Sequence, residues 1–161
     1  VRCKFAGSFD GRKAMASGEM QWMTGCQARA DVQKWRASSC AISSGIGSVL
    51  QDDSRLTIRK DQLDLPNVDD VLANPPLRVL LDTRLQISLD AAILKPGASH
   101  LLMCSKQTLD AAQHRLAHIL ALGEHLSVIG VSFCENNRLL LPEVLLFRAS
   151  LLCNVFLLES F

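Results

Sequence analysis

Hydrophobic residues fall into short runs and into helical repeats that alternate along the chain. Apolar runs bounded by Gly, Pro, Asn or Asp predict strands, and apolar residues three and four positions apart predict helices. The predicted strands lie around Cys3 and Phe5 and over residues 40–44, 56–59, 77–81, 101–104, 126–131 and 155–158. The predicted helices cover residues 26–38, 49–52, 109–120 and 142–147.

Turn and cap signals separate these elements. Asp10 and Gly11 form a turn dipeptide. Residues 24–27 have the T-x-x-Q form of a capping box, which predicts the helix from about Cys26. Residues 45–48 predict a turn, and the proline-rich acidic stretch 61–76 predicts a surface loop.

Strands that alternate with helices indicate an α/β fold with a largely parallel central sheet flanked by helices. Such sheets bind ligands at the carboxyl ends of their strands. Gly45, Asp82 and Glu159 each stand at the end of a predicted strand. The sequence therefore directs the search for a site to these three positions.

Length, charge and cysteine content limit the kinds of protein to which this chain can belong. The chain has 161 residues, enough for one domain, and its net charge is +1. This balance gives no general attraction to nucleic acid or to an anionic membrane. Six cysteines lack the C-x-x-C spacing of metal sites, and we expect reduced thiols and a cytoplasmic location. No apolar stretch approaches the roughly 20 residues that span a bilayer.

Two clusters suggest ligand chemistry. The glycines of residues 45–48, followed by the hydroxyl of Ser48, suit a phosphate or dinucleotide held by backbone N–H groups. Arg36 and Arg59, each at the end of a predicted element, suit a phosphate held by two guanidinium groups. The alternatives are an ordinary strand-to-helix turn and two solvent-facing arginines.

Other chemistry has little support in the sequence. His114 and His118 are four residues apart, as zinc ligands can be, but no third ligand accompanies them. We expect solvated histidines and no metal site. No G-x-S-x-G or P-loop motif is present, so no catalytic nucleophile is assigned.

A long segment resembles a known family. KFAGSFDGRKAMASGEMQWMTGCQARADVQKWRASSCAISSGIGSVLQDDSRLTIR, then PLRVLLDTRLQI, and more weakly NRLLLPEVL and CNVFLLES, follow its motifs. The chain resembles the reductase domain of the bacterial bifunctional riboflavin-biosynthesis deaminase/reductase. That family has a dihydrofolate-reductase-like fold.

The resemblance implies a reaction. The family uses NADPH to reduce 5-amino-6-(5-phosphoribosylamino)uracil to its ribityl product. By matching position, it implies NADPH contacts at Ala6, Trp22, Ser48, Asp52 and Thr83. It implies substrate contacts at Met20, Arg36, Leu56, Arg59 and Glu159. Met20 stands where the family has a serine, and a thioether cannot donate the hydrogen bond of a hydroxyl.

The resemblance also implies partners and a boundary. The family forms homodimers and carries a fused deaminase domain, whose H-x-E and P-C-x-x-C zinc signatures are not found here. After Glu159 the family continues into a glycine-rich turn and further strands. We therefore expect a single incomplete reductase domain over residues 1–161, with its last strands missing and an open edge at residues 155–158. The alternatives are a same-fold NADPH reductase with another substrate and a non-enzymatic remnant.

Overall fold

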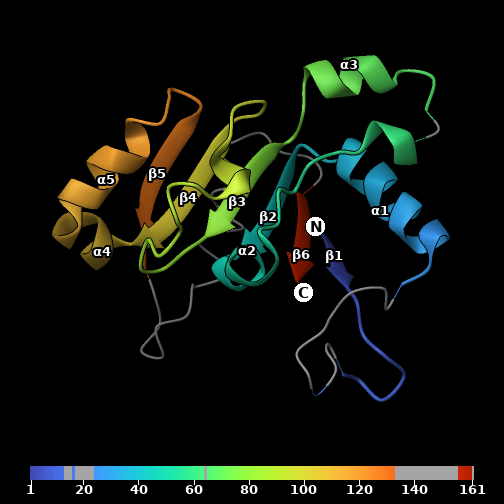
Figure 1. Ribbon diagram of the computed structural model, residues 1–161, viewed down its shortest axis with the longest axis horizontal. Coiled ribbons are helices and arrows are strands. Elements are labelled where there is room, and N and C mark those ends of the chain that lie inside the picture. The colour runs from blue at the N-terminus through green and yellow to red at the C-terminus, as the bar shows by residue number, and fades with distance from the viewer. Residues whose placement is uncertain (13–15, 17–23, 64, 133–155, 161) are drawn as a thin grey trace.

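A computed structural model of the chain describes residues 1–12, 16, 24–63, 65–132 and 156–160 (Figure 1). Its strands are β1 (Arg2–Phe5), β2 (Ala41–Gly45), β3 (Leu77–Leu81), β4 (His100–Ser105), β5 (Leu126–Val131) and β6 (Phe156–Ser160). Its helices are α1 (Cys26–Ala37), α2 (Ile46–Asp52), α3 (Val68–Ala73), α4 (Lys106–Ala111) and α5 (Gln113–Leu120). Two 3₁₀ turns are η1 (Lys60–Gln62) and η2 (Ala92–Leu94). The helix expected over residues 142–147 lies outside the described residues.

The described strands form one parallel sheet in the order β1-β6-β2-β3-β4-β5. The α/β class and the parallel sheet are as predicted. In this order β6 lies between β1 and β2, with Leu157 in register with both Arg2 and Ile42. The open edge expected at residues 155–158 is wrong, because this strand is paired on both sides and the edges are β1 and β5.

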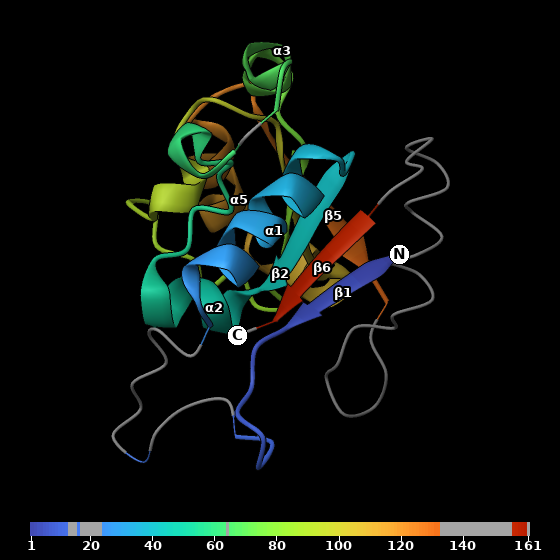
Figure 2. The same cartoon turned by 90° about the vertical axis from the view of Figure 1, so that its right-hand side faces the viewer.

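The core lies on both faces of the central strands, as expected where a parallel sheet is buried on both sides. One cluster joins the sheet to α2, η2 and α5 through residues such as Ile42, Val49, Leu80, Ile93 and Ile119. Figure 2 shows α1, α2 and α5 on the same side of the sheet. A smaller cluster covers the opposite face, with Ala41, Val79, Leu101, Met103 and Val131.

The segment that begins at Leu56, expected to be a strand, runs as irregular backbone. Leu56 is buried but adopts φ +51°, a conformation that does not continue a strand. The carbonyl of Thr57 accepts a hydrogen bond from Arg36 Nη1 at 2.7 Å. The N–H of Arg59 donates to Gln33 Oε1 at 3.0 Å. The strand prediction is wrong because side chains of α1, rather than a neighbouring strand, satisfy this backbone.

Several local boundaries also differ from the prediction. The first residue before α1 is Gly25, with no side-chain cap, so the capping box at Thr24 is wrong. Residues 45–48 form no separate turn, because α2 starts directly after Gly45. The helix expected over residues 109–120 is divided at Ala112 into α4 and α5. The loop expected over residues 61–76 contains α3.

Other expectations are met within the described residues. Gly11 adopts φ +77° in a turn closed by the hydrogen bond from its N–H to the carbonyl of Ser8 at 2.9 Å. Cys3, Cys26 and Cys104 are free thiols. In the part of the chain that the structure describes, each helix is too short or too polar to cross a bilayer.

Buried basic groups meet at the amino ends of β3 and β4. Arg78 Nη1 lies 3.2 Å from His100 Nε2, and both residues are buried. The ring of His125 packs against His100 edge to face, with centroids 5.4 Å apart. Burial lowers the pKa of His100 to about 4, with smaller contributions from the charges of Arg78 and His125. His100 is therefore neutral in the folded protein at neutral pH.

Because the pKa of His100 is lowered on folding, the free energy of unfolding depends on pH. Between pH 6.5, the ordinary pKa, and about pH 4, the unfolded chain binds a proton that the folded chain does not. The free energy of unfolding therefore falls as the pH falls through this range, by up to about 3 kcal/mol. Urea unfolding at several pH values measures it. We expect His100→Gln to flatten this dependence and His118→Gln, an exposed control, to leave it unchanged; equal slopes in all three proteins would contradict the assignment.

Candidate functional site

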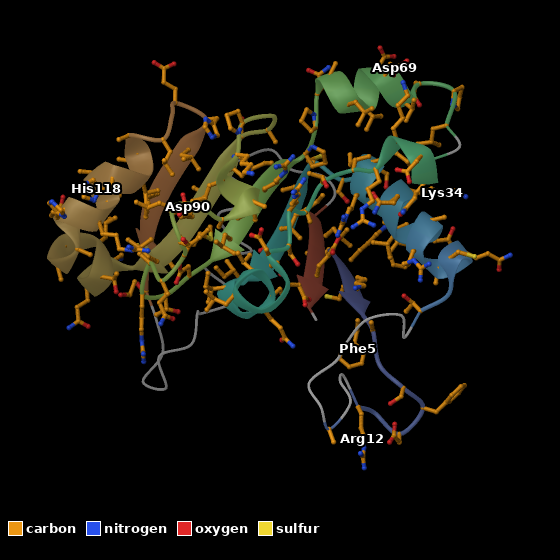
Figure 3. The ribbon with its side chains drawn as sticks, in the orientation of Figure 1. Phe5, Arg12, Lys34, Asp69, Asp90 and His118 are labelled. Carbon is orange, nitrogen blue, oxygen red and sulfur yellow. The ribbon has the colours of Figure 1, made fainter. Side chains whose placement is uncertain are left out.

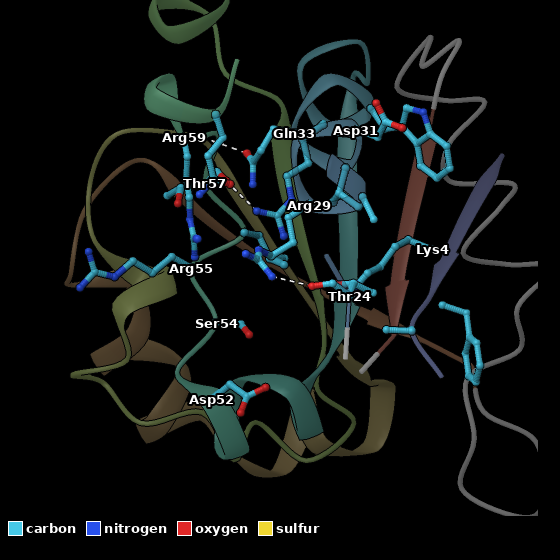
Figure 4. A pocket seen from close by; sticks show the side chains of 18 of the residues that line it. Lys4, Thr24, Arg29, Asp31, Gln33, Asp52, Ser54, Arg55, Thr57 and Arg59 are labelled. Carbon is cyan, nitrogen blue, oxygen red and sulfur yellow. Dashed lines mark hydrogen bonds between the residues drawn. The ribbon is translucent and has the colours of Figure 1, made fainter. Parts of the chain in front are cut away.

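An open cavity of about 1060 Å³ lies between β1, α1 and the segment that follows α2 (Figure 4). Parallel strands place β1, β6 and β2 with their carboxyl ends at this edge of the sheet. Five described lining residues are basic: Lys4, Arg29, Arg36, Arg55 and Arg59. Three are acidic: Asp31, Asp52 and Asp53. The balance favours an anionic ligand.

Half of the residues assigned from the sequence line this cavity. They are Ala6, Arg36, Asp52, Leu56 and Arg59. Positions that follow β1, that belong to α1 and α2 and that lie in the irregular segment after α2 therefore meet at one cavity.

The other assigned residues are placed differently. Glu159, on β6, is fully buried and is not a lining residue, but it contacts Arg36, which is one. Ser48 is buried on α2, and Thr83 follows β3, where its carbonyl accepts from Ser105 N at 3.1 Å; neither is among the lining residues. Met20 and Trp22 lie outside the described residues.

Arg36 and Glu159 form a buried, two-point ion pair. Arg36 Nε donates to Glu159 Oε1 at 2.6 Å, and Nη2 donates to Oε2 at 2.7 Å. The carboxylate of Glu159 is fully buried, and the Arg36 side chain is 10% exposed. The third nitrogen, Nη1, binds the carbonyl of Thr57. One guanidinium therefore ties α1 to β6 and to the irregular segment after α2.

Because of this ion pair, Arg36 and Arg59, both predicted to bind phosphate, are not equally available to a ligand. Each nitrogen of the Arg36 guanidinium already has an acceptor within the protein. Arg59 is exposed, and its backbone N–H is fixed by Gln33. Arg55 is also exposed and lines the same cavity. The surface of the cavity thus offers Arg59 and Arg55 to a ligand, while Arg36 is held in the wall.

Lys4 is a site residue that the sequence reasoning missed. It lines the cavity, and on the neighbouring strand its register partner is Glu159. Burial lowers the pKa of its ammonium from the ordinary value, while the charge of Glu159 acts in the opposite direction. No signal in the sequence pointed to it, because strand alternation favours burial of the apolar Cys3 and Phe5, whereas here both are exposed and Lys4 is half-buried.

The two helical histidines are not part of this site. His114 and His118 are exposed on α5, with ring centroids 4.3 Å apart. Figure 3 shows His118 at the opposite end of the molecule from Lys34 and Phe5. Within the described ranges, no group of three His, Cys, Asp or Glu side chains could hold a metal ion.

Comparison with known proteins matches this chain to one family. The family described as RibD C-terminal domain matches residues 1–145. Riboflavin biosynthesis protein RibD of Escherichia coli is 39% identical over 104 residues, which are 60% of this chain and 28% of that protein. Its Bacillus amyloliquefaciens counterpart is 34% identical over 145 residues, which are 90% of this chain and 35% of that protein.

A solved structure gives the same match. Acinetobacter baumannii RibD, form 1, is 32% identical with a TM-score of 0.70, over 99% of this chain and 38% of that one. The chain thus spans about a third of the length of the relatives that it matches.

The buried pair yields a prediction about stability. Glu159→Gln leaves the Arg36 guanidinium buried without a carboxylate, and we expect a loss of about 3–5 kcal/mol in the free energy of unfolding. The matched control is Asp69→Asn, which removes the exposed partner of Lys60 and should cost under about 1 kcal/mol. Urea unfolding of both variants measures the difference. Equal losses would show that the Arg36 pair contributes no more than a surface pair.

Proposed function

The chain belongs to the RibD C-terminal domain family, and from this membership we propose that it reduces 5-amino-6-(5-phosphoribosylamino)uracil with NADPH in riboflavin biosynthesis. The family match supports the resemblance identified from the sequence, including its dihydrofolate-reductase-like fold. The single observation that carries the proposal is the cationic cavity beside β1 and α1. A ribosylamine phosphate needs such a cavity, because its phosphate is the strongest charge on the molecule.

The residues around the cavity are compatible with a bound dinucleotide. Among the described residues, nothing lies within 4 Å of the position that a Cβ would take at Gly45 or Gly47. The backbone at the end of β2 is therefore open to close approach. We assign NADPH contacts to Ala6 and Asp52 at the cavity, to Ser48 and Thr83 near the strand ends, and to Trp22.

The substrate contacts follow from the same geometry. Arg59 binds the phosphate, because its guanidinium is exposed at the cavity. Leu56 forms part of the wall through its backbone and buried side chain. Arg36 contributes by holding Glu159 beside the substrate, and Met20 replaces the serine of the family.

The reaction adds one hydride and one proton and breaks the bond between C1′ and O4′ of the ribosyl ring. NADPH supplies the hydride to C1′ when it is bound. Lys4 is the group that donates the proton to O4′, because it is the half-buried ammonium in the cavity wall. Its lowered pKa brings it closer to the range in which a general acid works well. Glu159 stabilises the charged form of Lys4 between turnovers.

The proposed function predicts that the chain binds NADPH. Trp22 is an assigned NADPH contact, and Trp35 lines the cavity. We expect saturable quenching of tryptophan fluorescence by NADPH, reduced in both Trp22→Phe and Trp35→Phe. Absence of quenching in a folded chain, shown by circular dichroism, would favour the non-enzymatic alternative.

The proposed function also predicts catalytic turnover. The chain should oxidise NADPH, followed by absorbance, only in the presence of the phosphoribosylaminouracil. Arg59→Gln should raise the KM for this substrate by about tenfold or more, because a hydrogen bond to a charged group is worth about 1.5–3 kcal/mol. The affinity for NADPH should change little.

The control for this variant is Arg2→Gln, since Arg2 is an exposed arginine of β1 outside the lining of the cavity. Equal loss of substrate and cofactor affinity in Arg59→Gln would reject the phosphate role. NADPH binding without turnover would favour the same-fold reductase that acts on another substrate.

A further inference from the structure

Lys4 differs from the surface lysines of the chain. It is half-buried in the cavity wall, on a strand whose neighbour carries the buried Glu159. Lys34 and Lys60 are exposed, and they lie 3.8 Å from Asp31 and 2.5 Å from Asp69, respectively. An amine that is half-buried in a cavity wall is partly desolvated, and desolvation is one way in which proteins make lysines reactive.

The same cavity contains guanidinium groups that can bind an anionic group of a ligand. Arg55 and Arg59 are exposed along its wall, and both come from the irregular segment after α2. Figure 4 shows Lys4 on the opposite side of the cavity from Arg55 and Arg59. A small molecule with a phosphate at one end therefore meets guanidinium groups at that end and an amine at the other.

We propose that Lys4 is a covalent capture site for small aldehydes that carry a phosphate, which it binds as reversible imines. This goes beyond the proposed reductase reaction, in which no bond to the protein forms. The site does not depend on NADPH or on turnover. Phosphorylated sugars in their open-chain form and pyridoxal 5′-phosphate belong to this class of ligand.

The chemistry needs no partner outside the cavity and no oxidant or reductant. The neutral Nζ of Lys4 attacks the carbonyl carbon, the carbonyl π electrons move to oxygen, and one of the two nitrogen protons passes to that oxygen. The second nitrogen proton leaves with the hydroxyl as water, and a carbon–nitrogen double bond remains. Burial lowers the pKa of Lys4, so more of its amine is neutral at a given pH than at an exposed lysine. The Glu159 carboxylate beside it can favour the protonated imine.

The test uses pyridoxal 5′-phosphate as the probe. The intact chain is incubated with a low concentration of this aldehyde, the imine is reduced with borohydride, and the adduct is located by peptide mass spectrometry. We expect one early adduct, on Lys4, that is lost in Lys4→Arg and kept in Lys34→Arg and Lys60→Arg. Arg59→Gln should slow the reaction of pyridoxal 5′-phosphate but leave that of pyridoxal, which lacks the phosphate, unchanged.

Each result decides the proposal. Early adducts on Lys34, Lys60 or the amino group of Val1, with none on Lys4, would overturn it. Equal rates with pyridoxal and pyridoxal 5′-phosphate would overturn the phosphate requirement. Peptide mass spectrometry of the labelled protein without any substitution identifies the modified residue even if Lys4→Arg fails to fold. Because labelling is measured without NADPH, a chain that captures the aldehyde but shows no reductase activity would reject only the proposed function.

Discussion

The buried pair of Arg36 and Glu159 joins two of the segments that line the cavity to the strand β6. Arg36 belongs to α1, Glu159 to β6, and the carbonyl of Thr57 to the irregular backbone after α2. Two charges removed from water are tolerated only when their partners are in place together. The wall of the cavity therefore depends on the seating of β6, and so does the position of Lys4 beside Glu159.

The fold class was predictable because short apolar runs such as those of β3 and β5 alternate along the chain with helical repeats, a pattern that is visible without tertiary information. Strands β3 and β5 have the predicted bounds. The place of β6 was not predictable, because the order of strands is decided by contacts between residues far apart in the sequence. The backbone after Leu56 was misassigned for the same reason: its hydrogen-bond partners are side chains of α1.

The candidate site was located by resemblance more than by pattern. The motif match placed Ala6, Asp52 and Arg59 at one cavity, although the residue pattern alone left Arg59 with the alternative of a solvent-facing arginine. The sequence did not reveal that the guanidinium of Arg36 is paired inside the protein, because its acceptor lies 123 positions away. A spacing rule cannot identify such a pair, and strand alternation, which favours burial of Cys3 and Phe5, predicts the wrong side for Lys4.

The insertion of β6 between β1 and β2 has a consequence for synthesis of the chain. Arg2 is made more than a hundred residues before its neighbour in the sheet, Leu157. Until then β1 has no partner among the described strands, because β6 is its only neighbour in their order. Pairings so distant in sequence slow folding and prolong exposure of strand edges. Nascent chains of this protein therefore remain open to non-native association until translation reaches β6, and this favours protection by chaperones.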